Sequence, residues 1–227
     1  MSSVSLITIT KDNLTDFQDC FLPFVTDYSD QFSDVVVVDS SLGQDIETLS
    51  SRHSLNYVRS DPGRGLQLSL GAKESIGDWL LFLHSDTRLA GDWQSQINGH
   101  IESDGKKAAV FQLSFNTKNL GASTVASWAN FRTRFFILPY GDQGLLISKE
   151  LYDSIGGFDP NLPLMEDVDL IKRLGKQSIR LLKATALTSG AKYNAEGWLK
   201  RSLKHFKFFL LYRSGKSVRE IYQDYYR

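Results

Sequence analysis

Cysteine pairs, net charge and long apolar runs are all missing from this chain of 227 residues. The single cysteine, Cys20, excludes an internal disulfide. Lysine plus arginine and aspartate plus glutamate balance at 26 each, so no global electric field recruits nucleic acid. No apolar run is long enough to span a bilayer, and the opening MSSVSLITIT lacks the basic and apolar regions of a signal peptide. We therefore expect a cytoplasmic protein that does not bind nucleic acid.

Glycine-rich phosphate-binding loops are missing too. The segment TITKDNLTDF (8–17), which follows from the first predicted strand, contains no glycine. A dinucleotide-binding Rossmann site is therefore poorly supported, and no Walker-type loop occurs elsewhere. His53, His100 and His205 do not follow the spacing of metal ligands, so we expect ordinary surface or partly buried histidines there.

The residues that are present predict one α/β domain over residues 1–227. The chain is long enough for a large core, and 41% of its residues are hydrophobic and 12% aromatic. Apolar and β-branched runs alternate with segments of helical spacing; the runs lie at 4–10, 35–39, 55–60 and 78–84, and the helical segments at 45–53 and 65–77. This alternation is typical of βαβ units, so we expect a mostly parallel central sheet with helices on both faces.

In the second half of the chain the predicted strands and helices no longer alternate regularly. We expect strands at 108–115 and 142–148. We expect helices at 121–136, 149–155 and 166–176, and C-terminal helices from 195 onward.

Polar side chains gather where the first predicted strands end. Ligands bind beyond the carboxyl ends of the strands in open parallel sheets, and five candidates lie there: Thr8, Thr10, Asp39, Ser40 and Asp86. Asp39 follows four valines, and it either accepts hydrogen bonds from a ribose or base or caps the next turn. The residues leave these two interpretations even.

Asp86 lies in the stretch LLFLHSDTRL (81–90), where an apolar run ends in His84-Ser85-Asp86. A carboxylate here suits a hard divalent cation that bridges the phosphates of a nucleotide diphosphate. A polar turn after a strand is the simpler explanation of this segment alone.

Two further polar clusters have a functional and a simpler explanation. The acids at 166, 167 and 169 raise one another's pKa toward general-base strength, but acids in a first helical turn also stabilise the helix dipole. In GDQG (141–144) the glycines let a ligand approach the backbone, and Asp142 and Gln143 offer groups for sugar hydroxyls. A plain turn explains those glycines nearly as well.

Taken together and in order, these motifs resemble the family 2 glycosyltransferases of the GT-A fold. The matching stretches are VSLITIT, VVVVDSS, GRGLQLSLGAKESIGDWLLFLHSDTRL, PYGDQGLLISKELYDSIGGFD and LPLMEDVDL, from about residue 4 to 170. The chain is most similar to a bacterial subgroup in which LHxDT replaces the usual Asp-X-Asp. The resemblance implies a GT-A-like, Rossmann-related fold.

The resemblance also implies roles for single residues. It assigns the nucleotide to Thr8, Thr10, Asp39, Arg64, Ser85 and Asp86. Asp86 matches the last aspartate of Asp-X-Asp, which contacts the metal, and His84 is a departure that serves as a secondary ligand. Imidazole is a less natural ligand than carboxylate for Mn²⁺ or Mg²⁺, so the resemblance implies a weakly bound divalent cation. Asp167 matches the general base, with Glu166 beside it, and Asp142 and Gln143 contact the acceptor.

From these roles we expect a glycosyltransferase of the hexosyltransferase type, EC class 2.4. It moves a sugar from a nucleotide diphosphate sugar to a hydroxyl acceptor with inversion. Asp167 deprotonates the acceptor, while the cation near Asp86, helped by Arg64 or Lys192, offsets charge on the leaving diphosphate. The nucleotide-binding part covers about 1–115, the acceptor and catalytic part about 116–190, and the C-terminal helices about 191–227.

Two other classes of function stay open. A nucleotidyltransferase would use similar acids at the sheet edge, although it would be expected to carry a glycine-rich basic loop after the first strand. A non-catalytic sugar-nucleotide-binding protein would keep Asp39 and Asp86 and lose the base, and the presence of Asp167 argues against it.

The C-terminal segment breaks the charge balance of the chain. Between residues 192 and 219 eight lysines and arginines face a single acid, Glu196. Apolar residues recur there at helical spacing, at Trp198, Leu199, Leu203, Phe206 and Leu210. Such a helix either makes weak peripheral contact with an anionic membrane, which would suit a lipid-linked acceptor, or covers the core. We favour packing against the core, because it is the usual fate of an amphipathic helix.

Overall fold

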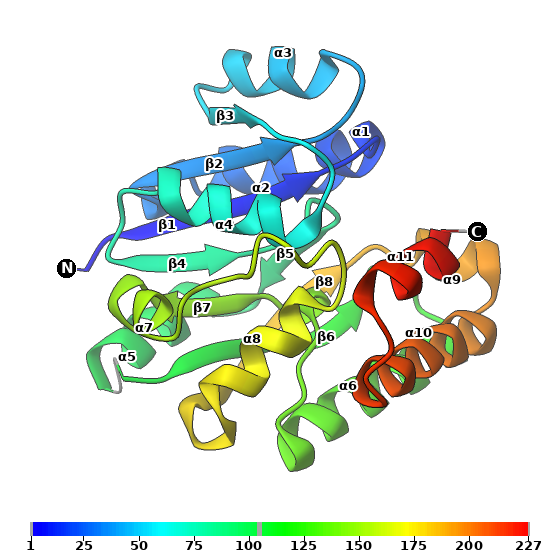
Figure 1. Ribbon diagram of the computed structural model, residues 1–227. Helices are drawn as coiled ribbons and strands as arrows, with labels where there is room; N and C mark the ends of the chain where they lie inside the picture. Colours follow the sequence, from blue (N-terminus) through cyan, green and yellow to red (C-terminus); the bar gives the residue numbers. More distant parts are fainter. Residues whose placement is uncertain (1, 104–105, 227) are drawn as a thin grey trace.

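One eight-stranded sheet runs through the computed structural model, which describes residues 2–103 and 106–226 (Figure 1). The strands lie in the order β3-β2-β1-β4-β7-β6-β8-β5. They span Val4–Thr10 (β1), Asp34–Asp39 (β2), Asn56–Arg59 (β3), Trp79–Phe82 (β4), Thr87–Ala90 (β5), Ala108–Phe115 (β6), Leu145–Ser148 (β7) and Ile179–Thr188 (β8).

The first half of the sheet is parallel and the second half is mixed. Strand β1 pairs in parallel with β2 and with β4, and β2 pairs in parallel with β3. Strand β7 pairs antiparallel with β4 and β6, β8 runs parallel to β6, and β5 runs antiparallel to β8. The carboxyl ends of β1, β2 and β4 therefore meet at one edge of the sheet, as the sequence predicts.

Helices cover both faces of the sheet, which confirms the expected fold class. The first half holds α1 (Leu14–Asp16), a π-helical turn (Phe17–Phe21), α2 (Leu22–Asp27), a 3₁₀ turn (Ser29–Gln31), α3 (Asp45–Arg52), α4 (Arg64–Glu74) and α5 (Trp93–Ser103). The second half holds α6 (Leu120–Phe136), 3₁₀ turns at Gly141–Gln143 and Lys176–Ser178, α7 (Lys149–Ser154), α8 (Glu166–Leu174), α9 (Ala191–Glu196), α10 (Trp198–Arg213) and α11 (Val218–Tyr226).

The alternation of side chains along the strands builds two cores. Leu6 faces the side packed by α2, α3 and α5, whereas its neighbour Ile7 faces the side packed by α4, α7 and α8. Leu81 and Leu80 divide in the same way. A strand with both faces buried is rich in apolar and β-branched residues, which is why β1, β2 and β4 stand out in the sequence.

Strands β5 and β8 and helices α1, α2 and α5 have no counterpart among the sequence predictions. Strand β5 is four residues long, lies at the edge of the sheet and carries the exposed Arg88, so its sequence resembles a polar loop. Strand β8 is a ten-residue strand whose Leu-Leu pair interrupts the alternation of apolar and polar residues. The pairing of β8 with β6 and β5, which is a tertiary interaction, makes it a strand.

The C-terminal helices form as predicted, but the favoured packing of their apolar stripe is wrong. Leu199, Leu203, Phe206 and Leu210 of α10 are exposed, while Phe208 and Phe209 of the same helix are buried. Trp198 is half-buried and stacks on Tyr193 with ring centroids 4.8 Å apart. The side of α10 that packs on the domain is therefore the one that carries Phe208 and Phe209.

Gln67 of α4 gives a direct test of how the sheet edge is held. Its buried Nε2 donates to the carbonyl oxygens of Thr10 (2.9 Å) and Val38 (3.0 Å), which lie at the ends of β1 and β2. The change Gln67→Leu leaves buried carbonyl groups short of a donor, so it should lower the free energy of unfolding by about 1–3 kcal/mol in urea denaturation. Lys73→Leu, on the exposed side of the same helix, is the control and should change it by under about 0.5 kcal/mol.

Candidate active site

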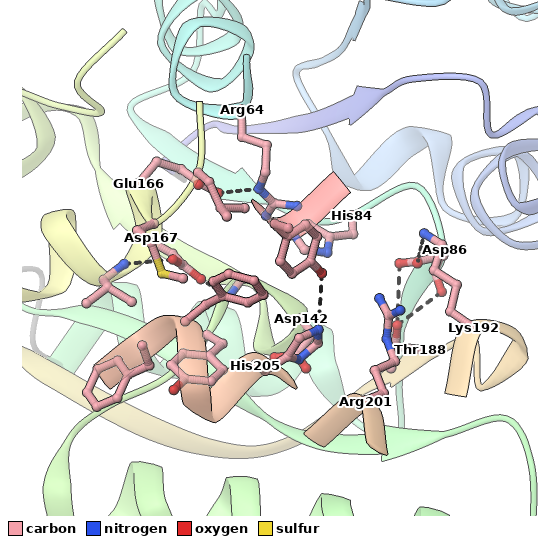
Figure 2. Close-up of a pocket in the computed structure, with 18 of the residues that line it drawn as sticks. Arg64, His84, Asp86, Asp142, Glu166, Asp167, Thr188, Lys192, Arg201 and His205 are labelled. Atoms are coloured by element: carbon pink, nitrogen blue, oxygen red, sulfur yellow. Dashed lines mark hydrogen bonds and ion pairs between the residues drawn. The ribbon is translucent and has the colours of Figure 1, made fainter. Parts of the chain in front are cut away.

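A cavity of about 190 Å³ opens beyond the carboxyl ends of the central strands (Figure 2). Its lining joins the start of α4, the turn after β4, the 3₁₀ turn before β7, the start of α8 and the helices α9 to α11. The acidic, basic and histidine side chains in it are Arg64, His84, Asp86, Asp142, Glu166, Asp167, Lys192, Arg201 and His205. Segments from most of the chain thus meet at this point.

A second cavity of about 310 Å³ adjoins the first on the side of β1. Thr10, Ser85 and Gln67 line it, and Arg64, His84, Asp86 and Lys192 line both cavities. The four shared residues mark the boundary where a ligand would pass from one cavity into the other.

Arg64 lies at this boundary and contacts both Glu166 and His84. Its Nε donates to Glu166 Oε1 at 2.5 Å, and its Nη2 lies 2.8 Å from His84 Nε2. Gly65 makes this position possible, because a Cβ there would stand 2.1 Å from the carbonyl oxygen of Asp159. The glycine lets the first turn of α4 press against the loop that leads to α8.

His84 acts as a neutral acceptor in this contact. Burial, reinforced by the positive charge of Arg64, lowers the pKa of His84 to about 4. Its Nε2 therefore accepts the hydrogen bond from Arg64 at neutral pH. Gly141 lies so close that a Cβ there would be 2.7 Å from the same nitrogen.

Asp86 lies at the other side of the cavity with a lysine beside it (Figure 2). Its Oδ2 is 3.6 Å from Lys192 Nζ, and its Oδ1 accepts from Thr87 Oγ1 at 3.1 Å. Burial by itself would raise the pKa of Asp86, but the charge that His84 carries when protonated at low pH, the charge of Lys192 and the hydrogen bond from Thr87 hold it below its usual value. Asp86 is therefore an anion at neutral pH.

These residues do not fit a dedicated metal site. In the part of the chain that the structure describes, no group of three or more His, Cys, Asp or Glu residues could hold an ion. The imidazole nitrogen of His84 already accepts from Arg64, and Asp86 already has Lys192 as a cationic partner. A divalent cation here would meet the positive charge of Arg64 and Lys192, and the weakly bound cation near Asp86 stays a prediction.

Asp167 is the best-anchored carboxylate of the cavity. Its Oδ2 accepts from the backbone N–H of Gly141 at 2.8 Å, and its Oδ1 accepts from the N–H of Val168 at 2.7 Å. Met165, two residues before it, is a non-glycine residue at φ 64°, a backbone strain of the kind that is concentrated at functional sites.

The neighbouring carboxyl groups of Glu166 and Asp142 have pKa values above their usual ones. Burial, with a contribution from Asp167, raises the pKa of Glu166 to about 7, although Arg64 opposes the shift. Burial also raises the pKa of Asp142 to about 6. Glu166 Oε2 and Asp142 Oδ1 have no hydrogen-bond partner among the described residues, so each is ready to bind a polar ligand group.

The loop that carries Asp142 is fixed by residues that the sequence did not single out. The Arg132 guanidinium lies 3.5 Å from the centroid of the Tyr140 ring, and its Nε donates to the carbonyl of Leu138 at 2.7 Å. Gln143 is fully buried, where it donates to the carbonyl of Phe111 and accepts from Thr133. The structure thus brings Asp142 to the cavity and gives Gln143 a place in the core instead.

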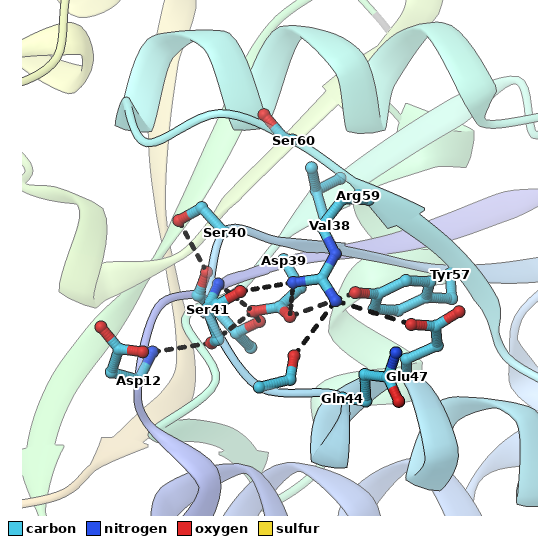
Figure 3. A network of polar contacts seen from close by, with 12 residues as sticks. Asp12, Val38, Asp39, Ser40, Ser41, Gln44, Glu47, Tyr57, Arg59 and Ser60 are labelled. Carbon is cyan, nitrogen blue, oxygen red and sulfur yellow. Dashed lines mark hydrogen bonds and ion pairs between the residues drawn. The ribbon is translucent and has the colours of Figure 1, made fainter.

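Asp39 lies outside both cavities, in a polar network of its own (Figure 3). Its Oδ1 accepts from Thr10 Oγ1 (2.7 Å) and from the Ser41 backbone N–H (3.0 Å), and its Oδ2 accepts from Tyr57 at 3.2 Å. The bond to Ser41, two residues on, is the one that the turn-capping interpretation predicts, and the assignment of Asp39 to the nucleotide stays a prediction. Thr8 is also fully buried and lines neither cavity.

The sequence missed the wall of the first cavity that α9, α10 and α11 build. Tyr193, Arg201, His205 and Tyr225 line it, and His205 Nε2 lies 3.2 Å from the Tyr225 hydroxyl. Burial, together with Arg201, lowers the pKa of His205 to about 4. The four-residue spacing of Arg201, His205 and Phe209 is the one pattern in the sequence that could have revealed this face.

No protein-family profile matches the sequence, and no curated protein is significantly similar to it. Several solved structures are similar in fold. GalNAc-T7 with UDP, GalNAc and Mn²⁺ has a TM-score of 0.62 and 14% identity, covering 83% of this chain and 44% of that one. Mannosyl-3-phosphoglycerate synthase from Rubrobacter xylanophilus has a TM-score of 0.60 and 13% identity, and the similarity covers 95% of this chain and 76% of that one.

A third similar structure is glucosyl-3-phosphoglycerate synthase from Mycobacterium tuberculosis in complex with Mn²⁺, UDP and glucosyl-3-phosphoglycerate. Its TM-score is 0.55 at 16% identity, covering 83% of this chain and 70% of that one. The chain spans less than half the length of GalNAc-T7. These similarities confirm the GT-A-like α/β fold; the LHxDT subgroup stays a prediction.

The raised pKa of Glu166 predicts a pH-dependent stability. Between pH 4.5 and about 7 the native state keeps a proton on Glu166 that the unfolded chain has released, so the free energy of unfolding falls as pH rises through this window. Glu166→Gln should remove this loss, which is on the order of 3 kcal/mol. Urea denaturation at several pH values measures it; the exposed Glu150→Gln should follow the wild-type curve, and a Glu166→Gln curve parallel to wild type contradicts the assignment.

Proposed function

We propose that the chain is a glycosyltransferase that moves a sugar from a nucleotide diphosphate sugar to a hydroxyl acceptor, with inversion. The observation that carries this proposal is the division of one cavity between an anchored carboxylate, Asp167, and two cations, Arg64 and Lys192. A base on one side and cations on the other match the charges that develop when a hydroxyl attacks and a diphosphate leaves.

The two adjoining cavities suit the two halves of such a donor. The nucleoside takes the second cavity, beside Thr10 and Ser85, and the transferred sugar takes the first. The diphosphate then lies at the shared boundary, where Arg64 and Lys192 donate charge-assisted hydrogen bonds to its oxygens. GalNAc-T7 and the mycobacterial synthase were crystallised with UDP, which supports a nucleotide diphosphate as the ligand class.

Asp167 is the base that we propose, in preference to its neighbour Glu166. Glu166, with a pKa of about 7, keeps much of its proton at neutral pH and also binds Arg64. Two backbone N–H groups orient Asp167 without neutralising it, so its carboxylate can take the proton of the acceptor hydroxyl. Asp142, whose Oδ1 is free of protein partners among the described residues, accepts a hydrogen bond from a sugar hydroxyl.

We assign the whole chain, residues 1–227, to one glycosyltransferase domain of family 2 and EC class 2.4. Its nucleotide-binding part covers about 1–115, its acceptor and catalytic part about 116–190, and its C-terminal helices about 191–227. A groove of about 220 Å³ between α6 and α10 shares Tyr140, Asp142 and Tyr193 with the first cavity and is otherwise mostly apolar. That groove favours a lipid-linked hydroxyl as the acceptor. A cytoplasmic location stays a prediction.

Exchange of the base should separate chemistry from binding. Asp167→Asn keeps the shape and removes the proton acceptor, so we expect turnover to fall by about 10²–10⁴-fold, the usual share of a general base. The dissociation constant for the donor nucleotide should stay within about threefold, measured by calorimetry. Turnover that survives in Asp167→Asn and disappears in Glu166→Gln would move the base to the neighbouring acid.

The cations should bind the diphosphate more than a metal does. In a calorimetric panel of UDP, GDP, CDP and TDP, Lys192→Gln should weaken the tightest ligand by about tenfold, because a charge-assisted hydrogen bond is lost. EDTA should weaken nucleotide binding by the wild type less than tenfold. Asp86→Ala should remove any increase in affinity that Mn²⁺ provides. Lys183→Gln, on an exposed lysine of β8, is the matched control. A ligand that binds wild type in Mn²⁺ and not at all in EDTA contradicts the cation assignment.

A further inference from the structure

Almost all of the large apolar side chains that lie exposed in the described part of the chain are on two helices. Helix α6 carries Leu120, Trp128, Phe131, Phe135 and Phe136, which are between 44% and 89% exposed. Helix α10 carries Leu199, Leu203, Phe206 and Leu210, between 49% and 73% exposed. Apart from these, the exposed large apolar residues are Leu42 and Ile76. Soluble surfaces rarely gather apolar side chains to this extent without a partner.

The two sets form stripes that adjoin. Trp128, Phe131 and Phe135 are three or four residues apart on α6, and Leu199, Leu203, Phe206 and Leu210 repeat in the same way on α10. The helices lie side by side at one end of the molecule (Figure 1). Trp128 and Phe206 line the same groove between them, so the two stripes make one apolar face.

Positive charge surrounds this face, and the helices supply no acid to balance it. Together α6 and α10 hold seven lysines and arginines and no aspartate or glutamate, in a chain whose net charge is zero. Lys200 and Lys207 are exposed. Lys200 comes directly after Leu199, and Lys207 directly after Phe206, so each lysine lies about 100° around the helix from a stripe residue. Arg134 and Arg213 are exposed on the same two helices.

From this combination we infer that the α6–α10 face docks on an anionic lipid bilayer. Aromatic and leucine side chains enter the boundary between headgroups and acyl chains, while the flanking lysines and arginines bind lipid phosphates. A second copy of this chain fits the face less well, because a two-fold contact would bring the same cations together without acids to pair them. Within residues 2–103 and 106–226 no helix is long and apolar enough to cross a membrane.

Docking in this way would bring the catalytic cavity to the membrane. The groove that Trp128 and Phe206 line also reaches Tyr140 and Asp142, which belong to the first cavity. A hydroxyl at the headgroup level would therefore enter beside the proposed acceptor residues. The docking face itself depends on exposed residues alone, so it stands or falls separately from the proposed sugar transfer.

Vesicle co-sedimentation tests the inference with two variants. The first, Phe131→Ser/Phe135→Ser/Leu199→Ser/Leu203→Ser, changes stripe residues that line no cavity described above. Its control is Leu42→Ser/Ile76→Ser, at residues that are at least as exposed and lie outside α6 and α10. The second, Lys200→Glu/Lys207→Glu, is matched by Lys73→Glu/Lys172→Glu, on exposed lysines of α4 and α8. Circular dichroism and thermal unfolding verify that each variant is folded.

We expect wild type to sediment with phosphatidylglycerol vesicles at about 50 mM salt, and far less with phosphatidylcholine or at about 500 mM salt. Each test variant should weaken binding by about tenfold or more, and each control should bind like wild type. The inference is wrong if wild type does not bind phosphatidylglycerol vesicles or if the controls weaken binding as much as the test variants. It is also wrong if sedimentation velocity shows a dimer that the four-serine variant abolishes while no vesicles are bound.

Discussion

The arrangement of the site depends on one interaction, the contact of Arg64 with Glu166 and His84. It ties together the start of α4, the end of β4 and the start of α8, which lie far apart in the sequence. A partly buried guanidinium needs acceptors for its N–H groups, and Glu166 and the neutral His84 supply them. The same cation faces both cavities, so the contact that holds the three segments also sets the charge at their boundary.

Much of the fold could be predicted because its first half is built from fully buried strands. Two-sided burial favours runs of apolar and β-branched residues at β1, β2 and β4, and such runs can be recognised in the sequence alone. Strands β5 and β8 were not predicted, because the pairing of β8 with β5 and β6 stabilises them and their sequences have no distinctive pattern. The apolar stripe of α10 was misplaced for a related reason. Periodicity finds an apolar face, but it cannot say whether a partner covers that face within the chain.

The site could be predicted only in part, and the residues show why. Arg64, His84, Ser85, Asp86, Asp142, Glu166 and Asp167 follow strand ends or begin helices at the predicted edge, and the structure brings them to the two cavities. Asp39 and Gln143 have equally polar side chains at similar positions, yet local hydrogen bonds use them inside the protein. Sequence position cannot separate these cases. The wall of Tyr193, Arg201 and His205 comes from helices whose docking is a tertiary event, so it had no local signal beyond spacing.

The central claim is that the boundary between the two cavities binds a diphosphate through cations. A crystal structure of the chain with the nucleotide diphosphate that binds most tightly, grown with Mn²⁺ present, tests it most directly. The account predicts phosphate oxygens within hydrogen-bond distance of both Arg64 and Lys192, with the nucleoside beside Thr10 and Ser85. A nucleotide bound elsewhere, or one held through Mn²⁺ with Arg64 and Lys192 turned away from the phosphates, would contradict it.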